Sequence, residues 1–218
     1  GANGAGKTTL VKLLCGFYYP TEGNIKLNGH EISEYNIEEY YSLISAVFQD
    51  IYLLPVTIAE FVSSSENEID REKVTDVIRQ AGLEDKVKAL PNGIDSKLMK
   101  GVFDDSIEMS GGEKQKLMLA RALYKDAPII VLDEPTAALD PIAENKLYLK
   151  YSELTANKTS VYISHRLAST RFCDRIIYLE NGRIVECGTH DELMKLGGKY
   201  AYMFDVQSHY YKENVENA

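Results

Sequence analysis

The 218-residue sequence contains no apolar run long enough to cross a membrane, and it has no secretory signal. A membrane-spanning helix needs roughly 18 consecutive apolar residues, whereas the apolar run Ile129–Leu132 has only the length of a buried strand. Basic residues are also in deficit, because 24 Lys and Arg stand against 33 Asp and Glu, which gives a formal charge of −9. A dedicated nucleic-acid-binding protein needs a basic surplus, so we expect no nucleic-acid partner.

Cysteine is scarce as well. The three cysteines, Cys15, Cys173 and Cys187, are far apart in the sequence and lack the spacing of metal ligands. We expect them to be reduced packing residues in a cytosolic setting. No internal repeat or low-complexity segment stands out, and the composition, 44% hydrophobic and 26% charged, is that of an ordinary globular protein. The length suits one α/β domain with a smaller lobe.

Hydrophobic periodicity and turn residues give a coarse order of elements. Helices are expected at Lys7–Cys15, Thr57–Leu90 and Ser110–Leu123, and Asp70 is the expected cap of a helix within the second stretch. Strands are expected at Ile25–Leu27, Ile44–Phe48, Ile129–Asp133, Ser160–Ile163, Arg175–Leu179 and Arg183–Glu186. Asn28-Gly29 is expected to form a hairpin turn after the first of them. The later alternation of strands and helices predicts a parallel sheet covered by helices. We predict an α/β fold with a core of residues 1–56 and 125–218 and a small helical subdomain near 57–124.

A glycine-rich segment opens the chain. Gly1–Thr8 matches the pattern G-x-x-x-x-G-K-[ST] at every fixed position. Its glycines let backbone N–H groups close around phosphate oxygens, and the following helix presents its positive end to them. Lys7 would reach the β- and γ-phosphates, and the Thr8 hydroxyl would bind Mg²⁺. The alternative is a glycine-rich turn before a helix. The expected phosphate-binding residues are Gly1, Ala2, Asn3, Gly4, Ala5, Gly6, Lys7, Thr8 and Thr9.

Two acidic residues, Asp133 and Glu134, follow the apolar run Ile129–Leu132. Ligands of open α/β sheets bind outside the carboxyl ends of the strands, so this is the expected place for catalytic acids. Asp133 would hold Mg²⁺, directly or through water, and Glu134 would polarise an attacking water. Taken alone, the pair is equally well explained as a solvated turn.

The segment Met109–Glu113 contains Ser110, Gly111, Gly112 and Glu113. Its simplest interpretation is a capping box, with Ser110 at the N-cap and Glu113 three residues later. The two glycines also leave backbone N–H groups uncovered, which creates a second helix end that can bind an anion. Two phosphate-seeking helix ends in one chain suggest that they belong to different halves of a dimer.

His165 follows the predicted strand Ser160–Ile163, so we expect it at the same sheet edge as the two acids. A lone histidine is more often a structural hydrogen-bonding group, and the position is what favours a functional role here. His190 lies near an expected helix start. We interpret it as structural, together with His30 and His209.

These four elements, in this order, resemble the ATP-binding cassette (ABC) domains of transporters, over nearly the whole chain. The spacing of Ser110–Glu113 about twenty residues before the acid pair is the most specific of these features. The resemblance implies a P-loop NTPase (RecA-like) core with an incomplete antiparallel β lobe. It also implies that Gln49 contacts Mg²⁺ and the water and links to the membrane domain, that Asp140 crosses a dimer interface, and that His165 contacts the γ-phosphate.

Several less specific segments resemble the cassettes of exporters in particular. They are Ser164–Ser169, Leu90–Asp95, Glu180–Arg183, Gly188–Leu193 and Gly197–Tyr200. An exporter cassette usually follows its membrane domain on one polypeptide. The resemblance therefore implies hydrolysis of ATP with Mg²⁺ at the cytoplasmic face of the cell membrane, with a second cassette and an upstream transmembrane domain as partners. The alternatives are an importer subunit, a soluble ABC ATPase of ribosomes or DNA, and a nucleotide sensor without catalysis, which an intact Glu134 and His165 disfavour.

The sequence departs from the family pattern in several places. Glu113 stands where glutamine is commoner, and Ala137 stands where serine is frequent. We expect mild effects from both. The strand that precedes the phosphate loop and the aromatic residue that stacks on adenine are not among these residues, and the chain opens in mid-motif at Gly1. We therefore expect a fragment of a longer protein that, in isolation, folds poorly and binds ATP weakly.

Overall fold

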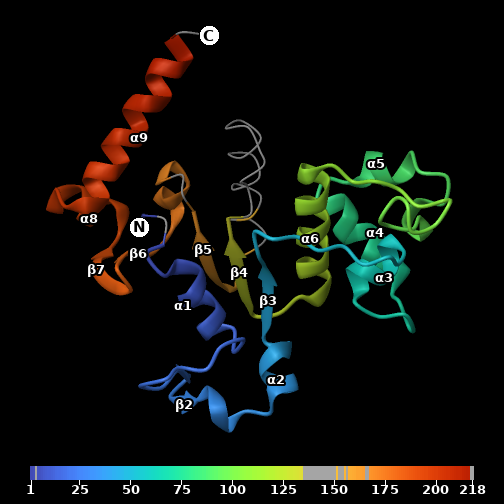
Figure 1. Cartoon of the computed structure of the whole chain (residues 1–218), viewed down its shortest axis with the longest axis horizontal. Helices are drawn as coiled ribbons and strands as arrows, with labels where there is room; N and C mark the ends of the chain where they lie inside the picture. Colours follow the sequence, from blue (N-terminus) through green and yellow to red (C-terminus); the bar gives the residue numbers. More distant parts are fainter. Residues whose placement is uncertain (3, 135–150, 152–154, 156, 165–166, 217–218) are drawn as a thin grey trace.

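A parallel sheet lies at the centre of the computed structural model, which describes residues 1–2, 4–134, 151, 155, 157–164 and 167–216 (Figure 1). Its strands are β3 (Ile44–Val47), β4 (Ile129–Asp133) and β5 (Thr159–Ile163), hydrogen-bonded in that order. The register pairs Val47 with Leu132, and Asp133 with Ile163. The strands thus end together at one edge of the sheet. The sequence predicted these three strands to within one residue at each end.

The two faces of the sheet are covered differently. Ile130 and Leu132 of β4 pack into a large apolar cluster shared with the helices after β3. The intervening Val131 packs into a second cluster on the opposite face, because successive side chains of a strand point to opposite sides. Helix α1 (Lys7–Leu14) supplies Val11 to that second cluster. A strand buried on both faces explains why β4 reads as a continuous apolar run.

The helices beside the sheet are α3 (Ile58–Ser63), α4 (Arg71–Gln80), α5 (Glu84–Lys88) and α6 (Gly111–Lys125). The stretch from Thr57 to Leu90 is mainly helical, as predicted, and the chain divides it into three short helices. Ser64 ends α3 with a left-handed φ of 57°, and Gly82 has a φ of 74° after α4. Both conformations interrupt the hydrogen-bond ladder of a helix.

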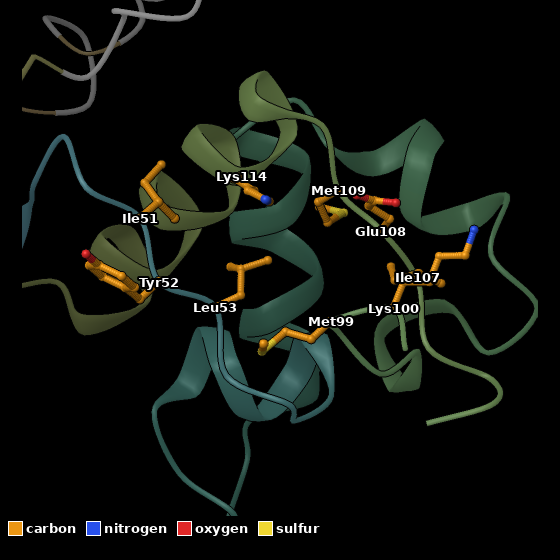
Figure 2. Close-up of a pocket in the computed structure, with 9 residues that line it drawn as sticks. All are labelled: Ile51, Tyr52, Leu53, Met99, Lys100, Ile107, Glu108, Met109 and Lys114. Carbon is orange, nitrogen blue, oxygen red and sulfur yellow. The ribbon is translucent and has the colours of Figure 1, made fainter. Parts of the chain in front are cut away.

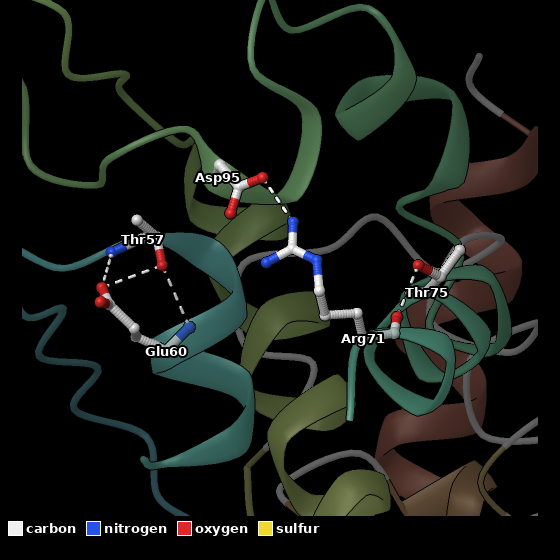
Figure 3. A network of polar contacts seen from close by, with 5 residues as sticks. All are labelled: Thr57, Glu60, Arg71, Thr75 and Asp95. Atoms are coloured by element: carbon white, nitrogen blue, oxygen red, sulfur yellow. Dashed lines mark hydrogen bonds and ion pairs between the residues drawn. The ribbon is translucent and has the colours of Figure 1, made fainter. Parts of the chain in front are cut away.

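Side-chain caps fix where these helices begin. Asp70 accepts the backbone N–H of Lys73 at 2.9 Å, so the predicted cap of α4 is confirmed. Thr57 and Glu60 form a reciprocal capping box at α3 (Figure 3). The same view shows Arg71 pairing with Asp95 at 2.5 Å, which ties α4 to the 3₁₀ turn Gly93–Asp95. The pair is exposed, so its contribution to stability is small.

A small β lobe follows α1. It contains β1 (Lys26–Leu27) and β2 (His30–Glu31), then the 3₁₀ turn Ile32–Glu34 and α2 (Ile37–Ser42). Asn28 and Gly29 have φ values of 52° and 91°, as a two-residue hairpin turn requires. The predicted hairpin turn is therefore confirmed.

A second hairpin comprises β6 (Ile176–Glu180) and β7 (Arg183–Gly188). The predicted strand Arg175–Leu179 forms as β6, but its partner among the described residues is β7 and not a strand of the parallel sheet. Asn181 and Gly182, with φ values of 48° and 72°, return the chain directly and so favour antiparallel pairing.

The C-terminal part contains the 3₁₀ segment Leu167–Phe172, α8 (His190–Leu196) and α9 (Lys199–Glu216). Figure 1 shows α9 projecting away from the rest of the structure, with its first turns beside α8 and β7. A third apolar cluster lies at this base. Its buried members are Leu167, Ile176, Tyr178, Leu193 and Tyr200. None of the helices in the described ranges combines the length and apolar character of a membrane span.

Candidate nucleotide-binding site

The glycine-rich loop leads directly into α1. Gly4 and Gly6 have φ values of 75° and 97°, conformations that residues with a Cβ atom rarely adopt. Gly6 occupies the N-cap of α1 without a side-chain cap, and no acidic residue lies in the first turn. Thr8 and Thr9 are exposed in that turn. Among the described residues, no side chain caps the first N–H groups of α1, which suits this helix end to an anion.

Lys7 lies over its own loop. Its ammonium donates hydrogen bonds to the backbone oxygens of Gly1 and Ala2, both at 2.9 Å. Burial lowers the pKa of Lys7, while the carboxylates of Glu134 and Asp133 oppose that effect. The fold thus brings the loop lysine into the field of the two acids, which are more than 120 positions away in the sequence.

Asp133 is the last residue of β4 and only 2% exposed. Its Oδ1 has no hydrogen-bond partner, and a buried carboxylate oxygen without one is costly unless a cation or donor meets it. The predicted metal ligands, Thr8, Gln49 and Asp133, all offer hard oxygen atoms, which suit Mg²⁺. Within the described ranges, no group of three or more His, Cys, Asp and Glu forms a metal centre by itself. The residues therefore fit a Mg²⁺ that shares its coordination with phosphate oxygens and water.

Glu134 sits one residue beyond β4, with a left-handed φ of 50°. Its backbone N–H donates to the carbonyl oxygen of Ile163, the last residue of β5, at 3.0 Å. This bond places Glu134 across the carboxyl ends of two strands. A non-glycine residue in this conformation is strained, and such strain is often found at functional sites.

Ser110 caps α6 through the predicted capping box, which is confirmed. The N–H of Glu113 donates to Ser110 Oγ at 3.3 Å, and the N–H of Ser110 donates to Glu113 Oε2 at 2.8 Å. Lys86 of α5 pairs with the other Glu113 oxygen at 3.2 Å. Partial burial of Glu113 raises its pKa, but the bonds from Ser110 and Lys86 lower it by more, so the net shift is downward. Figure 1 shows α6 and α1 on opposite sides of β3 and β4.

The remaining predicted site residues are placed as follows. Gln49 is exposed two residues beyond β3, at the same sheet edge as Asp133. Ala2, Ala5, Gly111 and Gly112 lie in the segments already described. Asn3, Asp140 and His165 fall outside the described residues. The structure therefore groups Lys7 with Asp133 and Glu134, whereas the roles of the individual residues stay predictions.

A cavity of about 310 Å³ lies between the segment after β3 and the loops before α6 (Figure 2). Part of the lining directly follows Gln49, which the family resemblance links to the membrane domain. The other side of the cavity was missed, because nothing in the local pattern links it to residue 52. The lining residues are Ile51, Tyr52, Leu53, Met99, Lys100, Ile107, Glu108, Met109 and Lys114.

Three features define a P-loop nucleotide-binding domain. They are a glycine-rich loop, a helix start suited to an anion directly after it, and two acids at the edge of a parallel sheet. The ABC transporter family model matches residues 1–137. The chain therefore belongs to the ABC transporter family, in which ATP hydrolysis is the standard activity.

Curated relatives and a solved structure point to the exporter type. The chain is 40% identical, over 210 residues, to a protein of Cupriavidus pinatubonensis named ATP-dependent lipid A-core flippase. It is 42% identical, over 207 residues, to the protein of the same name from Burkholderia orbicola. Each match covers 95% of this chain but 35% and 34% of the relative, so the chain spans about a third of their length.

A solved bacterial Atm1-family ABC exporter with ATP bound matches with a TM-score of 0.85 and 33% identity. That match covers 95% of this chain and 36% of the solved chain. Over 95% of its length, the chain is therefore similar to about a third of a solved ABC exporter.

Proposed function

We propose that this domain drives export across a membrane by hydrolysing MgATP as one of two paired cassettes at the cytoplasmic face. The observation that carries the proposal is the position of the phosphate loop and Lys7 within the electrostatic field of Asp133 and Glu134, which lie at the end of the central strand β4. Phosphoryl transfer needs a cation for the γ-phosphate, an acid that holds the metal and an acid that orients the water. Lys7, Asp133 and Glu134 could supply these at one edge of the sheet.

In the proposed reaction, the loop amides and Lys7 stabilise the charge on the γ-phosphoryl group. Mg²⁺, held by Thr8 and Asp133 with Gln49 nearby, would neutralise phosphate charge. Glu134 orients a water whose oxygen attacks the γ-phosphorus, while the bond to the β,γ-bridging oxygen breaks and ADP departs. His165 would contact the γ-phosphate from the chain that follows β5.

The second cassette completes the site. Ser110, Gly111 and Gly112 begin α6, and Lys7 begins α1, the helix on the other side of β3 and β4 (Figure 1). We therefore place this helix end against the γ-phosphate bound by the partner cassette, with Asp140 at the interface between the two. Glu113 is held in the capping box and by Lys86, so it supports the helix end while its own oxygens are engaged.

The cavity beside Tyr52 is the proposed contact with the transmembrane domain, which we place upstream on the same polypeptide. One wall is Ile51–Leu53, just after Gln49, and the other includes Met109, the residue before Ser110. An intracellular helix seated there would touch the segments that lead to both nucleotide contacts. We propose that it transmits the closing and opening of the cassettes.

Glu134→Gln tests the catalytic assignment in the full-length protein. The amide keeps the shape but loses the negative charge that polarises water, so phosphate release should fall by about 10²-fold or more. ATP-dependent dimers should persist, as measured by light scattering. Glu66→Gln, in the exposed loop after α3, is the matched control and should leave turnover unchanged. Undiminished hydrolysis by the Glu134 variant would remove this residue from the proposed role.

A further inference from the structure

The phosphate loop contacts the hairpin of β6 and β7, which is more than 170 positions away in the sequence. The backbone N–H of Gly182, in the hairpin turn, donates to the carbonyl oxygen of Ala5 at 3.1 Å. A Cβ atom added to Gly6 would lie 3.6 Å from the Cα of Gly182, so these two backbones are close together. A Cβ atom added to Gly1 would overlap the carbonyl oxygen of Leu179 on β6. The hairpin therefore contacts the loop near both of its ends.

The bond to Ala5 fixes the orientation of one N–H group in the loop. The peptide that joins Ala5 to Gly6 is trans, so its C=O and N–H groups point in opposite directions. Because the carbonyl oxygen points to Gly182, the N–H of Gly6 points away from the hairpin. Gly6 occupies the N-cap of α1 and is one of the residues expected to bind phosphate. The hairpin thus orients an N–H group of the expected phosphate site.

The hairpin is itself held firmly in place. Ile176 and Tyr178 of β6 are buried in the third apolar cluster. On β7, both carboxylate oxygens of Glu186 accept N–H groups from the first turn of α9, from Lys199 at 2.5 Å and from Tyr200 at 2.9 Å. A carboxylate is favourable there because the helix dipole is positive at this end. The turn that contacts the phosphate loop therefore has a rigid base.

The chain contains a second turn that matches this one closely. Asn181 and Gly182 have φ values of 48° and 72°, and Asn28 and Gly29, between β1 and β2, have 52° and 91°. Both glycines are exposed, and a Cβ atom added to either would meet no atom within 4 Å. Among the described residues, only the turn at Gly182 donates a hydrogen bond to the phosphate loop. The two turns thus differ in this contact and not in their local chemistry.

We propose that Gly182 is a positioning residue for ATP binding. Its N–H holds the peptide between Ala5 and Gly6 in the orientation that presents the Gly6 N–H to phosphate oxygens. This inference rests on the proposed function, because the role of the loop in binding phosphate is part of it. An N–H group that meets phosphate before and during the reaction contributes to affinity more than to the rate of the chemical step.

The test compares Gly182→Val with Gly29→Val in the full-length protein. A β-branched side chain is strongly disfavoured at positive φ, so each variant strains its own turn to a similar degree. Gly182→Val should raise the Kd and KM for ATP on the order of tenfold, because a hydrogen bond to a charged group is lost. Its kcat should stay within about threefold of wild type, since Asp133 and Glu134 are unchanged. Gly29→Val should bind ATP within about twofold of wild type.

Two further variants of the same residue separate positioning from loss of folded protein. Gly182→Asn should restore the Kd to near that of the wild type, because asparagine adopts left-handed conformations more readily than most residues. Gly182→Ala, which imposes a weaker strain, should give the same pattern as Gly182→Val with a smaller rise in Kd. Amide hydrogen exchange in residues 4–10 should be faster in Gly182→Val but not in Gly29→Val.

Thermal unfolding provides the comparison with a purely structural role. Both valine variants should unfold at a lower temperature than the wild type, so a structural role alone predicts equal changes in ATP affinity. Equal Kd values for the two valine variants would overturn the proposal, and so would unchanged exchange in residues 4–10 of Gly182→Val. A wild-type protein that binds ATP without hydrolysing it would instead refute the proposed function, and the comparison of Kd values would still decide the role of Gly182.

Discussion

At the scale of single residues, the thiols differ sharply in their surroundings. Cys15 is 1% exposed and packs beneath α1, and burial raises its pKa to about 11. Burial raises the pKa of Cys173 to about 11 as well, with a smaller effect from Asp174. Cys187 is exposed on β7. The exposure of Cys187 departs from the expectation that all three cysteines are packing residues.

These environments predict selective alkylation. At pH 8 roughly one Cys15 or Cys173 thiol in a thousand is a thiolate, because the pH lies about three units below each raised pKa. Iodoacetamide should therefore modify Cys187 first, and modification of the other two should rise only as the pH approaches 11. Mass spectrometry of peptides gives the rates, and urea-unfolded protein, in which all three react, is the control. Equal rates in the native protein would contradict the burial of Cys15.

At the scale of elements, reciprocal caps start α3, α6 and α8 in the same way. Each has a Ser or Thr at the N-cap and a Glu three residues later. The three caps are chemically alike, yet only the one at Ser110 is followed by two glycines. The cap provides stability, and the glycines provide access to the backbone.

This difference can be measured with matched variants. Ser110→Ala and Thr57→Ala should each lower the free energy of unfolding by about 0.5–2 kcal/mol, because each removes one cap. Urea titrations give these values. Only Ser110→Ala should also weaken ATP-dependent dimerisation, since the proposed partner nucleotide contacts α6 and not α3. Equal dimerisation of the two variants would exclude Ser110 from the interface.

The elements also show what sequence patterns could and could not predict. The strands of the parallel sheet, the cap at Asp70 and the capping box at Ser110 were predictable, because each depends on neighbours within a few residues. The breaks at Ser64 and Gly82 were missed because the apolar spacing of a helix can continue through such residues. Tertiary packing then determines whether the helix ends there. The hydrogen bond from the Leu167 N–H to Gln207 Oε1 joins residues 40 positions apart, so no local sequence pattern predicts it.

At the scale of the whole molecule, the cavity of Figure 2 joins segments that are about fifty positions apart in the sequence. Tyr52 lines it and is 80% exposed, so its ring is available without disturbing the core. Met109 on the opposite wall is buried directly before the cap of α6. A ligand of this cavity would contact both the segment after β3 and the segment that leads into α6.

Tyr52→Ala should separate hydrolysis from transport. The change removes an aromatic contact with the proposed intracellular helix but leaves Lys7, Asp133 and Glu134 in place. In reconstituted full-length protein, we expect ATP hydrolysis within about twofold of wild type and transport reduced by about fivefold or more. Tyr202→Ala, which removes another exposed aromatic side chain, on α9, is the control. Normal transport by the Tyr52 variant would exclude this cavity as the coupling contact.

The two bonds from Lys7 to its own loop have a consequence for the kinetics of nucleotide capture. The ammonium already meets two neutral carbonyl oxygens, and phosphate oxygens are stronger acceptors because they are charged. When a triphosphate arrives, Lys7 exchanges its two carbonyl acceptors for phosphate oxygens. The ammonium is already in place, so the loop needs little rearrangement. Association at this loop should accordingly be governed by diffusion and charge, and departure by how fast the lysine returns to Gly1 and Ala2.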